Sequence, residues 1–313
     1  MRCLCVCLNA AVDTTYVVDR LQTGSTTRVV ERTAVPGGKA INLARVLAAL
    51  GHEPVVTGFV GGRAGETIES GLRDQGIETS FLAVAGESRM CLAVLERSGE
   101  VSELLEGGLD VAPGDAARFL EHAAELAGGV DAVAVSGSLP AGLPADYYAR
   151  LLKRLRPLTG LLALDTSGEP LRQGLAGRPD LIKPNRDEVR DLAPGGPDDD
   201  AALAESLRAS LIGPVLAGDA RVLLTLGADG AALISAAGVL RAAAPAVTAV
   251  NPVGAGDATL AGFIAALLEG AADAEALARS VAVGAASTLH PVAGVVRRQD
   301  IDRLRAHARA GGA

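Results

Sequence analysis

Short apolar runs alternate with amphipathic stretches along most of the chain. The apolar runs are bounded by glycine, proline or polar residues, and they predict strands at 3–9, 54–60, 131–136, 161–165, 181–183 and 221–226. Between some of them, apolar residues recur at helical spacing and stop at a glycine, which predicts helices at 41–50, 66–75 and 258–269. Strands that alternate with helices predict an α/β fold with a mainly parallel sheet.

The first predicted strand carries three of the four cysteines. Cys3, Cys5 and Cys7 occupy alternate positions, so in a strand they share one face while larger aliphatic residues share the other. The paired Cys-x-x-Cys spacing of a zinc site is missing. We therefore interpret these cysteines as small buried residues.

Two segments break the alternation of strands and helices. Residues 14–33 and 87–106 consist of short β-prone runs with polar alternation. They are far apart in the sequence, but they can pair into a small accessory sheet. Such a sheet beside an α/β core predicts a lid over a cleft. We expect residues 1–313 to form a single domain with a β lid from about 14–33 and 87–106.

Composition excludes several classes of partner. The net charge is 29 − 37 = −8 and there is no basic tract, while aromatic residues make up only 2%. These features argue against nucleic acid as a partner. Because no run of about 18 uncharged apolar residues appears and the start of the chain does not resemble a signal peptide, we expect no membrane partner and a cytoplasmic location.

The strongest chemical motif is Gly254-Ala255-Gly256-Asp257, which directly precedes a predicted helix. Glycines allow a tight turn that points successive N–H groups at one place, and the helix N-terminus adds positive partial charge. A carboxylate beside such an anion site can accept a proton from an attacking hydroxyl. Asp257 occupies that position, although a helix cap after a turn is the plainer interpretation.

Other motifs are modest when taken singly. Pro36-Gly37-Gly38-Lys39-Ala40-Ile41-Asn42 opens a predicted helix with flexible backbone, a cation and an amide, and Asp13 follows the first strand. Three further strand ends run into turns: Ser136-Gly137-Ser138, Lys183-Pro184-Asn185 with Glu188, and Thr225-Leu226-Gly227 with Gly230.

The order and content of these motifs resemble the PfkB (ribokinase-like) family of carbohydrate kinases. Within it, the chain is most similar to the branch of 1-phosphofructokinase and tagatose-6-phosphate kinase. The resemblance extends from Leu8-Asn9 to about Pro291 and includes SGSLPAG, DTSGEPL, KPNRDE and TLGADGA in the expected order. It implies a ribokinase-like α/β/α core with a small β-sheet lid, and a homodimer formed through the lids.

The resemblance also implies roles for individual residues. Asp257 would be the catalytic base, and the loop from Gly254 through Ala255 and Gly256 would form the anion hole for the γ-phosphoryl group of ATP. The sugar phosphate would be held by Asp13, Arg28, Gly37, Gly38, Lys39, Asn42, Arg89 and Ser138. The phosphates of ATP and Mg²⁺ would be organised by Lys183, Asn185 and Glu188, with Glu188 acting on the metal through water. The nucleotide would be lined by Thr225, Gly227 and Gly230.

The chain departs from the pattern of this branch around the sugar. Ala10 stands where proline is usual, Ala40 replaces a glycine, Met90-Cys91 replace Thr-Asn, and Pro252 replaces threonine. We expect an ATP- and Mg²⁺-dependent kinase that converts fructose 1-phosphate to fructose 1,6-bisphosphate. The alternatives are a tagatose-6-phosphate kinase, a 6-phosphofructokinase, a kinase of an unphosphorylated sugar, and a catalytically silent sugar-phosphate sensor.

Overall fold

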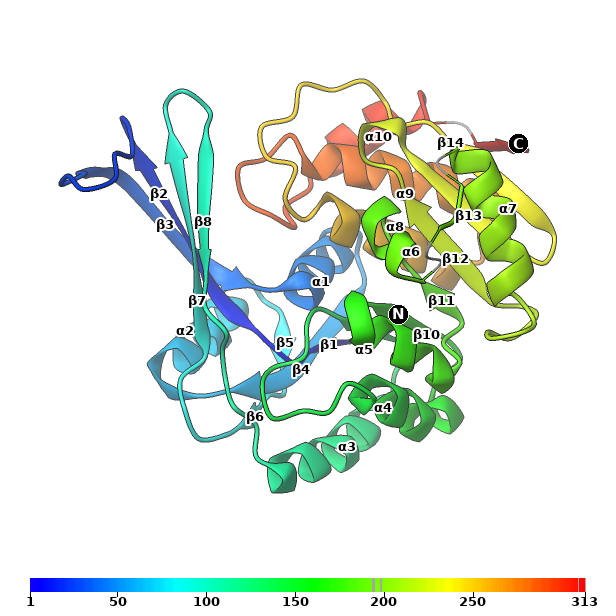
Figure 1. The fold of residues 1–313 in the computed structure, drawn as a ribbon, viewed down its shortest axis with the longest axis horizontal. Helices are drawn as coiled ribbons and strands as arrows, with labels where there is room; N and C mark the ends of the chain where they lie inside the picture. The colour runs from blue at the N-terminus through cyan, green and yellow to red at the C-terminus, as the bar shows by residue number, and fades with distance from the viewer. Residues whose placement is uncertain (193–194, 198, 309, 313) are drawn as a thin grey trace.

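A large sheet with helices on both faces forms most of the molecule, and a smaller sheet stands at one side (Figure 1). The computed structural model describes residues 1–192, 195–197, 199–308 and 310–312. Strand order in the large sheet is β15-β14-β13-β12-β11-β10-β9-β1-β4-β5, with β6 also paired to β4. The strands from β12 to β5 are parallel, and β13 to β15 extend one edge in antiparallel fashion. The predicted α/β fold with a mainly parallel sheet is therefore confirmed.

Six strands of the large sheet, β1, β4 and β9 to β12, lie close to the predicted ones, with ends that differ by one or two residues, whereas β5, β6, β13, β14 and β15 were not predicted. Their bounds are β1 Arg2–Cys7, β4 Glu53–Val60, β5 Glu78–Thr79, β6 Leu82–Ala83, β9 Ala132–Ser136, β10 Leu162–Asp165, β11 Leu181–Ile182, β12 Arg221–Thr225, β13 Ala231–Ser235, β14 Gly238–Ala242 and β15 Ala310–Gly312. Because the strands are parallel, the carboxyl ends of β9, β10 and β11 meet at one edge, where ligands of open α/β sheets bind.

Helices cover the two faces of this sheet in two layers. The bounds are α1 Lys39–Ala49, α2 Gly62–Asp74, α3 Pro113–Ala127, α4 Tyr147–Leu155, α5 Gly168–Gly174, α6 Arg186–Leu192, α7 Asp200–Leu211, α8 Ala255–Leu268, α9 Asp273–Ser287 and α10 Arg298–Arg305. One apolar core contains buried residues of α1, α2 and α8–α10, and the other contains residues of α3–α7. The cysteines of β1 lie in the first core and Leu4, Val6 and Leu8 lie in the second, as their alternation predicts.

The smaller sheet, called the lid sheet here, has the strand order β3-β2-β7-β8. Its strands are β2 Ala11–Val18, β3 Val29–Gly37, β7 Arg89–Glu96 and β8 Val101–Leu105. β2 and β7 pair in parallel, with Asp13 opposite Cys91. The two segments predicted to pair from a distance therefore do so, and the sheet extends beyond the predicted bounds to Ala11 and Gly37.

Within the described residues, no helix is both long enough and apolar enough to cross a lipid bilayer.

The contact between β1 and β4 depends on a residue without a side chain. Gly58 pairs with Cys7 and has a φ of 154°. A Cβ atom added at Gly58 would lie 1.8 Å from the Cys7 carbonyl oxygen. Backbone atoms cannot give way as a flexible side chain can, so β1 and β4 would have to separate.

Gly58→Ala is therefore expected to lower the free energy of unfolding by about 3 kcal/mol, because it forces apart two central strands. Urea denaturation monitored by circular dichroism measures the change. The matched control is Gly114→Ala in the first turn of α3, where an added Cβ meets nothing within 4 Å. If both variants unfold at the wild-type urea concentration, the close approach of β1 and β4 does not constrain residue 58.

Candidate active site

The buried carboxyl group of Asp257 stands at the N-terminus of α8. Gly254 precedes the helix with a φ of 81°, a left-handed conformation that suits glycine, and the first helical bond runs from Ala258 N to Gly254 O. Asp257 is only 6% exposed, and its Oδ2 accepts a hydrogen bond of 2.9 Å from the Asn42 amide nitrogen on α1. The turn therefore holds Asp257 in the first turn of α8, facing α1.

Burial raises the pKa of Asp257 to about 7, and the negative charge of Asp165 contributes to the increase. The hydrogen bond from Asn42 and the ammonium groups of Lys39 and Lys183 act in the opposite direction. A carboxylate with this pKa is a stronger base than an exposed aspartate and is still largely ionised just above neutral pH. Asp257 is thus suited to accept a proton.

Free N–H groups lie next to this carboxylate. The Ala255 N–H donates to the Pro252 carbonyl at 3.2 Å, whereas those of Gly256 and Asp257 have no acceptor inside the helix. A Cβ atom on Gly256 would lie 3.5 Å from Lys183 Nζ, so this ammonium group stands beside the helix N-terminus. Two N–H groups and a lysine therefore face one place, while Ala255, predicted as a donor, already has an acceptor.

Two lysines share the buried carboxylate of Asp165, which ends β10. Lys183 Nζ lies 3.1 Å and Lys39 Nζ 3.3 Å from Asp165 Oδ1, and the Ser136 hydroxyl donates to Oδ2 at 2.9 Å. Lys183 is 4% exposed and Asp165 is fully buried. Burial alone would raise the pKa of Asp165, but Lys183 and Lys39 hold it below its usual value. The carboxylate thus fixes two ammonium groups at the carboxyl edge of the sheet.

Lys39 lies beside the residues predicted to organise the nucleotide phosphates. Its Nζ is 3.5 Å from Glu188 Oε1 as well as near Asp165. Burial would lower the pKa of Lys39, but Asp165, Glu188 and Asp257 raise it above its usual value. The ammonium group is therefore held in its charged form, next to Lys183, where the phosphates of a nucleotide would meet the helix N-terminus.

Asn185 and Glu188 form a reciprocal cap at the start of α6. Glu188 N donates to Asn185 Oδ1 at 2.8 Å, and Asn185 N donates to Glu188 Oε2 at 2.9 Å. This cap leaves Glu188 Oε1 directed at Lys39. Thr225 N donates to the Pro184 carbonyl at 3.0 Å, which joins the end of β12 to this turn. The residues predicted to organise the nucleotide phosphates are therefore brought together.

The glycines predicted to line the nucleotide lie in the turn after β12. Gly227 has a φ of 63°, and an added Cβ there would meet nothing within 4 Å, so this turn borders open space. Gly230 instead lies against the backbone, because its added Cβ would be 2.0 Å from the Ala242 carbonyl oxygen. Gly230 is therefore required by packing, and Gly227 is free to border a ligand.

The predicted sugar side is built around Asp13 on β2. A Cβ atom on Gly37 would lie 2.0 Å from Asp13 Cγ, so only glycine leaves room for this carboxyl group. Burial raises the pKa of Asp13, whereas the charge of Arg89 and a hydrogen bond from the Cys91 thiol lower it. Gly38, with a φ of 119°, leads from this point into α1 and towards Asn42.

Arg89, Asn9 and Ser138 converge beside Asp13. Arg89 Nε donates to the Asn9 carbonyl at 3.1 Å, and the Asn9 amide nitrogen donates to the Ser138 hydroxyl at 3.1 Å. Arg89 is the first residue of β7, and Ser138 follows β9. This group combines a forked cation with hydroxyl and amide groups, which suits a phosphate.

Arg28 lies outside this group in a single copy of the chain. It immediately precedes β3, an extended strand of nine residues that ends at Gly37. At about 3.3 Å per residue, Val29 is about 26 Å from Gly37. Arg28 is exposed near the far end of the lid sheet. Its predicted contact with the substrate would therefore require another copy of the chain or a movement of the lid sheet.

The positions that depart from the family pattern have different surroundings. Ala40 is fully buried, and its methyl group packs within the apolar core. Met90 is 41% exposed on the lid sheet. Pro252 lies before the anion loop and contributes its carbonyl to Ala255. Of these, Cys91 is the position that touches Asp13.

Sequence reasoning assigned no role to Asn9, Arg45 or Asp165. Asp165 was detectable, since it ends a predicted strand whose carboxyl end lies at the ligand-binding edge of a parallel sheet. Asn9 follows the first strand in the same way. Arg45 lies within a helical pattern, and nothing in that pattern distinguishes a buried arginine from an exposed one.

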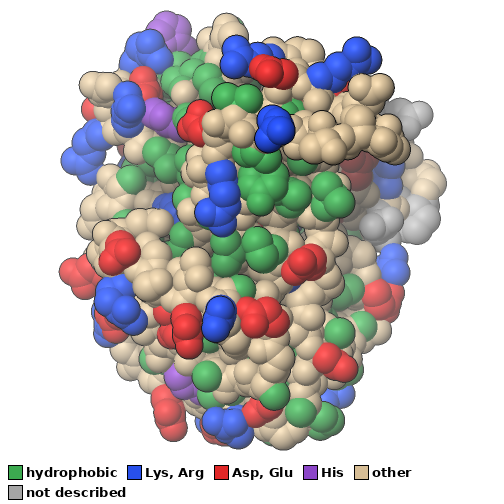
Figure 2. All heavy atoms as spheres, turned by 90° about the vertical axis from the view of Figure 1, so that its left-hand side faces the viewer, with side chains coloured by type: hydrophobic (Ala, Val, Ile, Leu, Met, Phe, Trp, Pro, Cys, Tyr) green, Lys and Arg blue, Asp and Glu red, His purple; other side chains and the backbone are tan. Residues whose placement is uncertain are grey.

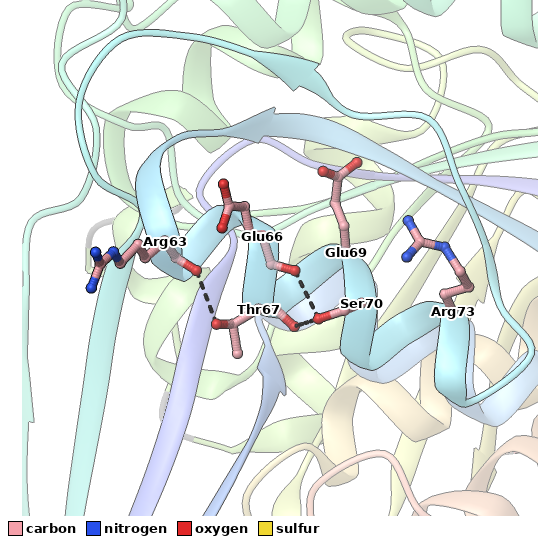
Figure 3. Close-up of a pocket in the computed structure, with 6 residues that line it drawn as sticks. All are labelled: Arg63, Glu66, Thr67, Glu69, Ser70 and Arg73. Carbon is pink, nitrogen blue, oxygen red and sulfur yellow. Dashed lines mark hydrogen bonds between the residues drawn. The ribbon is translucent and has the colours of Figure 1, made fainter.

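One hollow on the surface does not coincide with these residues. A hollow of about 570 Å³ on the outer side of α2 is lined by Arg63, Glu66, Thr67, Glu69, Ser70 and Arg73 (Figure 3). The Thr67 and Ser70 hydroxyls donate to carbonyls of their own helix. All residues that line this hollow lie on one polar face of α2. The residues of the candidate site instead come from the lid sheet, from α1 and α8 and from the carboxyl ends of the central strands.

Comparison with known proteins agrees with this geometry. The model of the pfkB family of carbohydrate kinases matches residues 4–297. Phosphofructokinase-2 from Escherichia coli, in its tetrameric inhibited form, is 27% identical with a TM-score of 0.88 and 98% of each chain covered. In complex with substrates and products it is 25% identical with a TM-score of 0.91, covering 98% of this chain and 99% of that one.

A third solved structure extends the likeness of the fold. A possible 1-phosphofructokinase from Thermotoga maritima is 23% identical, with a TM-score of 0.88 and 100% of both chains covered. Together with the family match over nearly the whole length, these similarities extend to the fold of the entire chain. The chain belongs to the pfkB family of carbohydrate kinases.

Proposed function

We propose that this protein transfers the γ-phosphoryl group of ATP to the primary hydroxyl of a ketohexose monophosphate, with fructose 1-phosphate as the first candidate. The observation that carries the proposal is the position of Asp257. Its buried carboxylate lies between a group of residues suited to a sugar phosphate and a helix N-terminus with two lysines suited to ATP phosphates. The products would be fructose 1,6-bisphosphate and ADP.

In this reaction the substrate hydroxyl oxygen forms a bond to the γ-phosphorus, and the bond from that phosphorus to the β–γ bridging oxygen breaks. Asp257 accepts the hydroxyl proton. The N–H groups of Gly256 and Asp257, with Lys183 and Lys39, face the negative charge of the transferred group. Phosphoryl transfer depends mainly on such positioning and charge stabilisation. Asp13 would orient the sugar hydroxyls, and Arg89 with Asn9 and Ser138 would bind the phosphate already present.

The residues on the phosphate side fit a hydrated Mg²⁺ ion. The described residues contain no group of three His, Cys, Asp or Glu side chains arranged to hold a metal. Mg²⁺ characteristically keeps several waters and takes its remaining ligands from substrate phosphates and one or two carboxylates. Glu188, whose Oε1 lies outside the helix cap, would hold the ion through water. When bound, Mg²⁺ supplies charge neutralisation for the ATP phosphates.

Fructose 6-phosphate is the second candidate substrate, because of the likeness to phosphofructokinase-2, which has been crystallised in complex with fructose-6-phosphate.

A coupled assay of ADP release with fructose 1-phosphate, fructose 6-phosphate, tagatose 6-phosphate, fructose and ribose tests both candidate substrates. Preference for one phosphosugar identifies the substrate. Preference for an unphosphorylated sugar contradicts the proposal. Binding of ATP and a sugar phosphate without turnover favours the sensor.

We propose that two copies associate through their lid sheets in the cytoplasm. Val29 and Val30 of β3 and Leu104 and Leu105 of β8 are 45% to 65% exposed. Figure 2 shows hydrophobic side chains spread over the side of the molecule that includes the lid sheet. Covering such side chains with a second copy removes apolar surface from water, and it would bring the Arg28 of one copy towards the site of another.

Asp257→Asn is expected to lower kcat about 100- to 10,000-fold, since the amide cannot accept the hydroxyl proton and general base catalysis contributes a factor of this size. ATP binding, measured by calorimetry, should persist. The pKa of Asp257 is higher in the folded protein than in the unfolded chain, so folding favours the protonated carboxyl group between the usual aspartate pKa and 7. The stability that this protonation contributes is lost as the pH rises through 7. The variant should therefore unfold at an equal or higher temperature than wild type at pH 8. Turnover near the wild-type rate contradicts the role of Asp257.

Arg89→Ala is expected to raise KM for the phosphosugar about tenfold or more, because a charged hydrogen bond contributes roughly 1.5–3 kcal/mol. KM for ATP should change less than about twofold. The control is Arg97→Ala, which removes an arginine of the same lid region that pairs with Asp19 at the surface. Equal increases in both KM values for Arg89→Ala show that Arg89 does not contact the substrate phosphate.

The decrease of kcat at acidic pH is expected to follow the protonation of Asp257. Since its pKa is raised to about 7 by burial, kcat should fall as pH drops below neutrality and the base becomes protonated. Steady-state rates between pH 5 and 9 with saturating substrates measure this limb. A kcat that stays constant down to about pH 5, well below the raised pKa, excludes this carboxyl group as the base.

A further inference from the structure

A buried arginine on α1 links the lid sheet to the residues around the base. Arg45 is 8% exposed. Its Nε donates to Gln75 Oε1 at 2.8 Å, its Nη1 donates to Asn42 Oδ1 at 3.1 Å, and its Nη2 donates to the Pro36 carbonyl in β3. The negative charge of Asp13 also acts on the guanidinium. One side chain therefore contacts α1, the end of α2 and the base of the lid sheet.

The bond from Arg45 to Asn42 determines which way the Asn42 amide faces. A guanidinium has only donors, so the Asn42 atom that faces it must be the oxygen. The amide nitrogen then points the opposite way and donates to Asp257 Oδ2 at 2.9 Å. A turned amide would place its oxygen against the carboxylate, where two acceptors repel each other. The direction of both hydrogen bonds thus follows from the donors of Arg45.

We propose that Arg45 is a positioning residue for the catalytic base, which fixes the Asn42 amide so that its N–H is held towards the ionised carboxylate of Asp257. Arg45 does not touch the reacting atoms and acts through Asn42. The same guanidinium holds the Pro36 carbonyl, one residue before the glycine that makes room for Asp13. It therefore sets the sugar-binding segment and the base in a fixed relation. This inference rests on the proposed role of Asp257.

Loss of the Arg45 contact is expected to raise the pKa of Asp257. The charged groups around its carboxylate are Lys39 on α1, Lys183 after β11 and Asp165 at the end of β10, and none of them is a hydrogen-bond partner of Arg45. The Asn42 hydrogen bond favours the ionised form. Its weakening would make Asp257 easier to protonate, so catalysis would require a higher pH.

The test compares Arg45→Met with Gln75→Ala. Methionine fills similar space without donors, whereas Gln75→Ala removes a different partner of the same guanidinium and leaves the Asn42 contact. Loss of one hydrogen bond of about 1 kcal/mol predicts that the acid limb of kcat moves up by about 0.5–1 pH unit in Arg45→Met. Gln75→Ala should leave the limb in place. Arg45→Lys, which restores a charged donor, should move it back towards wild type.

A direct measurement separates this inference from the function itself. Titration of the Asp257 carboxyl carbon by NMR of protein labelled in aspartate, assigned with Asp257→Asn, does not require turnover. An upward shift in Arg45→Met supports the positioning role even if no sugar phosphate reacts, a result that would contradict the proposed function alone. The positioning role is overturned if Arg45→Met lowers the rate or the thermal stability but leaves both the titration of Asp257 and the acid limb of kcat unchanged. If Arg45→Met does not fold, Arg45→Gln, neutral and shorter, replaces it under the same criteria.

Discussion

The burial of one carboxylate determines much of this structure. An ionised aspartate is costly to remove from water unless it is paired and hydrogen-bonded. Asp257 is 6% exposed at the start of α8, where the helix N-terminus, the Asn42 amide and two nearby lysines oppose that cost without cancelling it. The remaining imbalance makes the group basic enough to accept a proton near neutral pH. The unfavourable environment is therefore the source of its raised pKa.

The cations beside Asp257 are fixed by a second buried carboxylate. Asp165 holds Lys39 and Lys183 within 3.3 Å, and the lysines in turn keep it ionised. Asp165 ends β10 and Lys183 follows β11, so the parallel pairing of these strands sets one of these contacts. Lys39 joins them from α1 on the other side of the site. A rigid sheet edge thus presents positive charge where an incoming phosphate chain would lie, and no charged side chain has to be ordered at the moment of binding.

The sugar side depends on contacts between distant segments. Asp13 lies on β2 of the lid sheet, and the parallel pairing of β2 with β7 places Cys91 beside it. Gly37 leaves the space that the Asp13 carboxyl group fills. Arg89 enters the site because it is the first residue of that paired strand. Replacing the family's asparagine by Cys91 puts a thiol against Asp13, a less polar neighbour for a group that would read sugar hydroxyls. The residues around Asp13 therefore come from segments that the lid sheet brings together.

The sequence by itself determined the local elements, the two faces of β1 and the order of the motifs. Alternation of apolar residues and glycine stops are local properties, so six strands of the large sheet and α1, α2 and α8 were predicted within a few residues. Asp257 was identifiable because glycines and a helix start adjoin it in the chain. Tertiary structure decided that Lys39 contacts Asp165 and Glu188, that Ala40 packs in the core, and that Arg28 stands far from Asp13. It also decided that Arg45 is buried against Asn42. These outcomes depend on which face of a helix packs against which strand end, and on the register of the strands in the lid sheet. Both are set by contacts between residues that are distant in sequence, and no local pattern encodes such contacts.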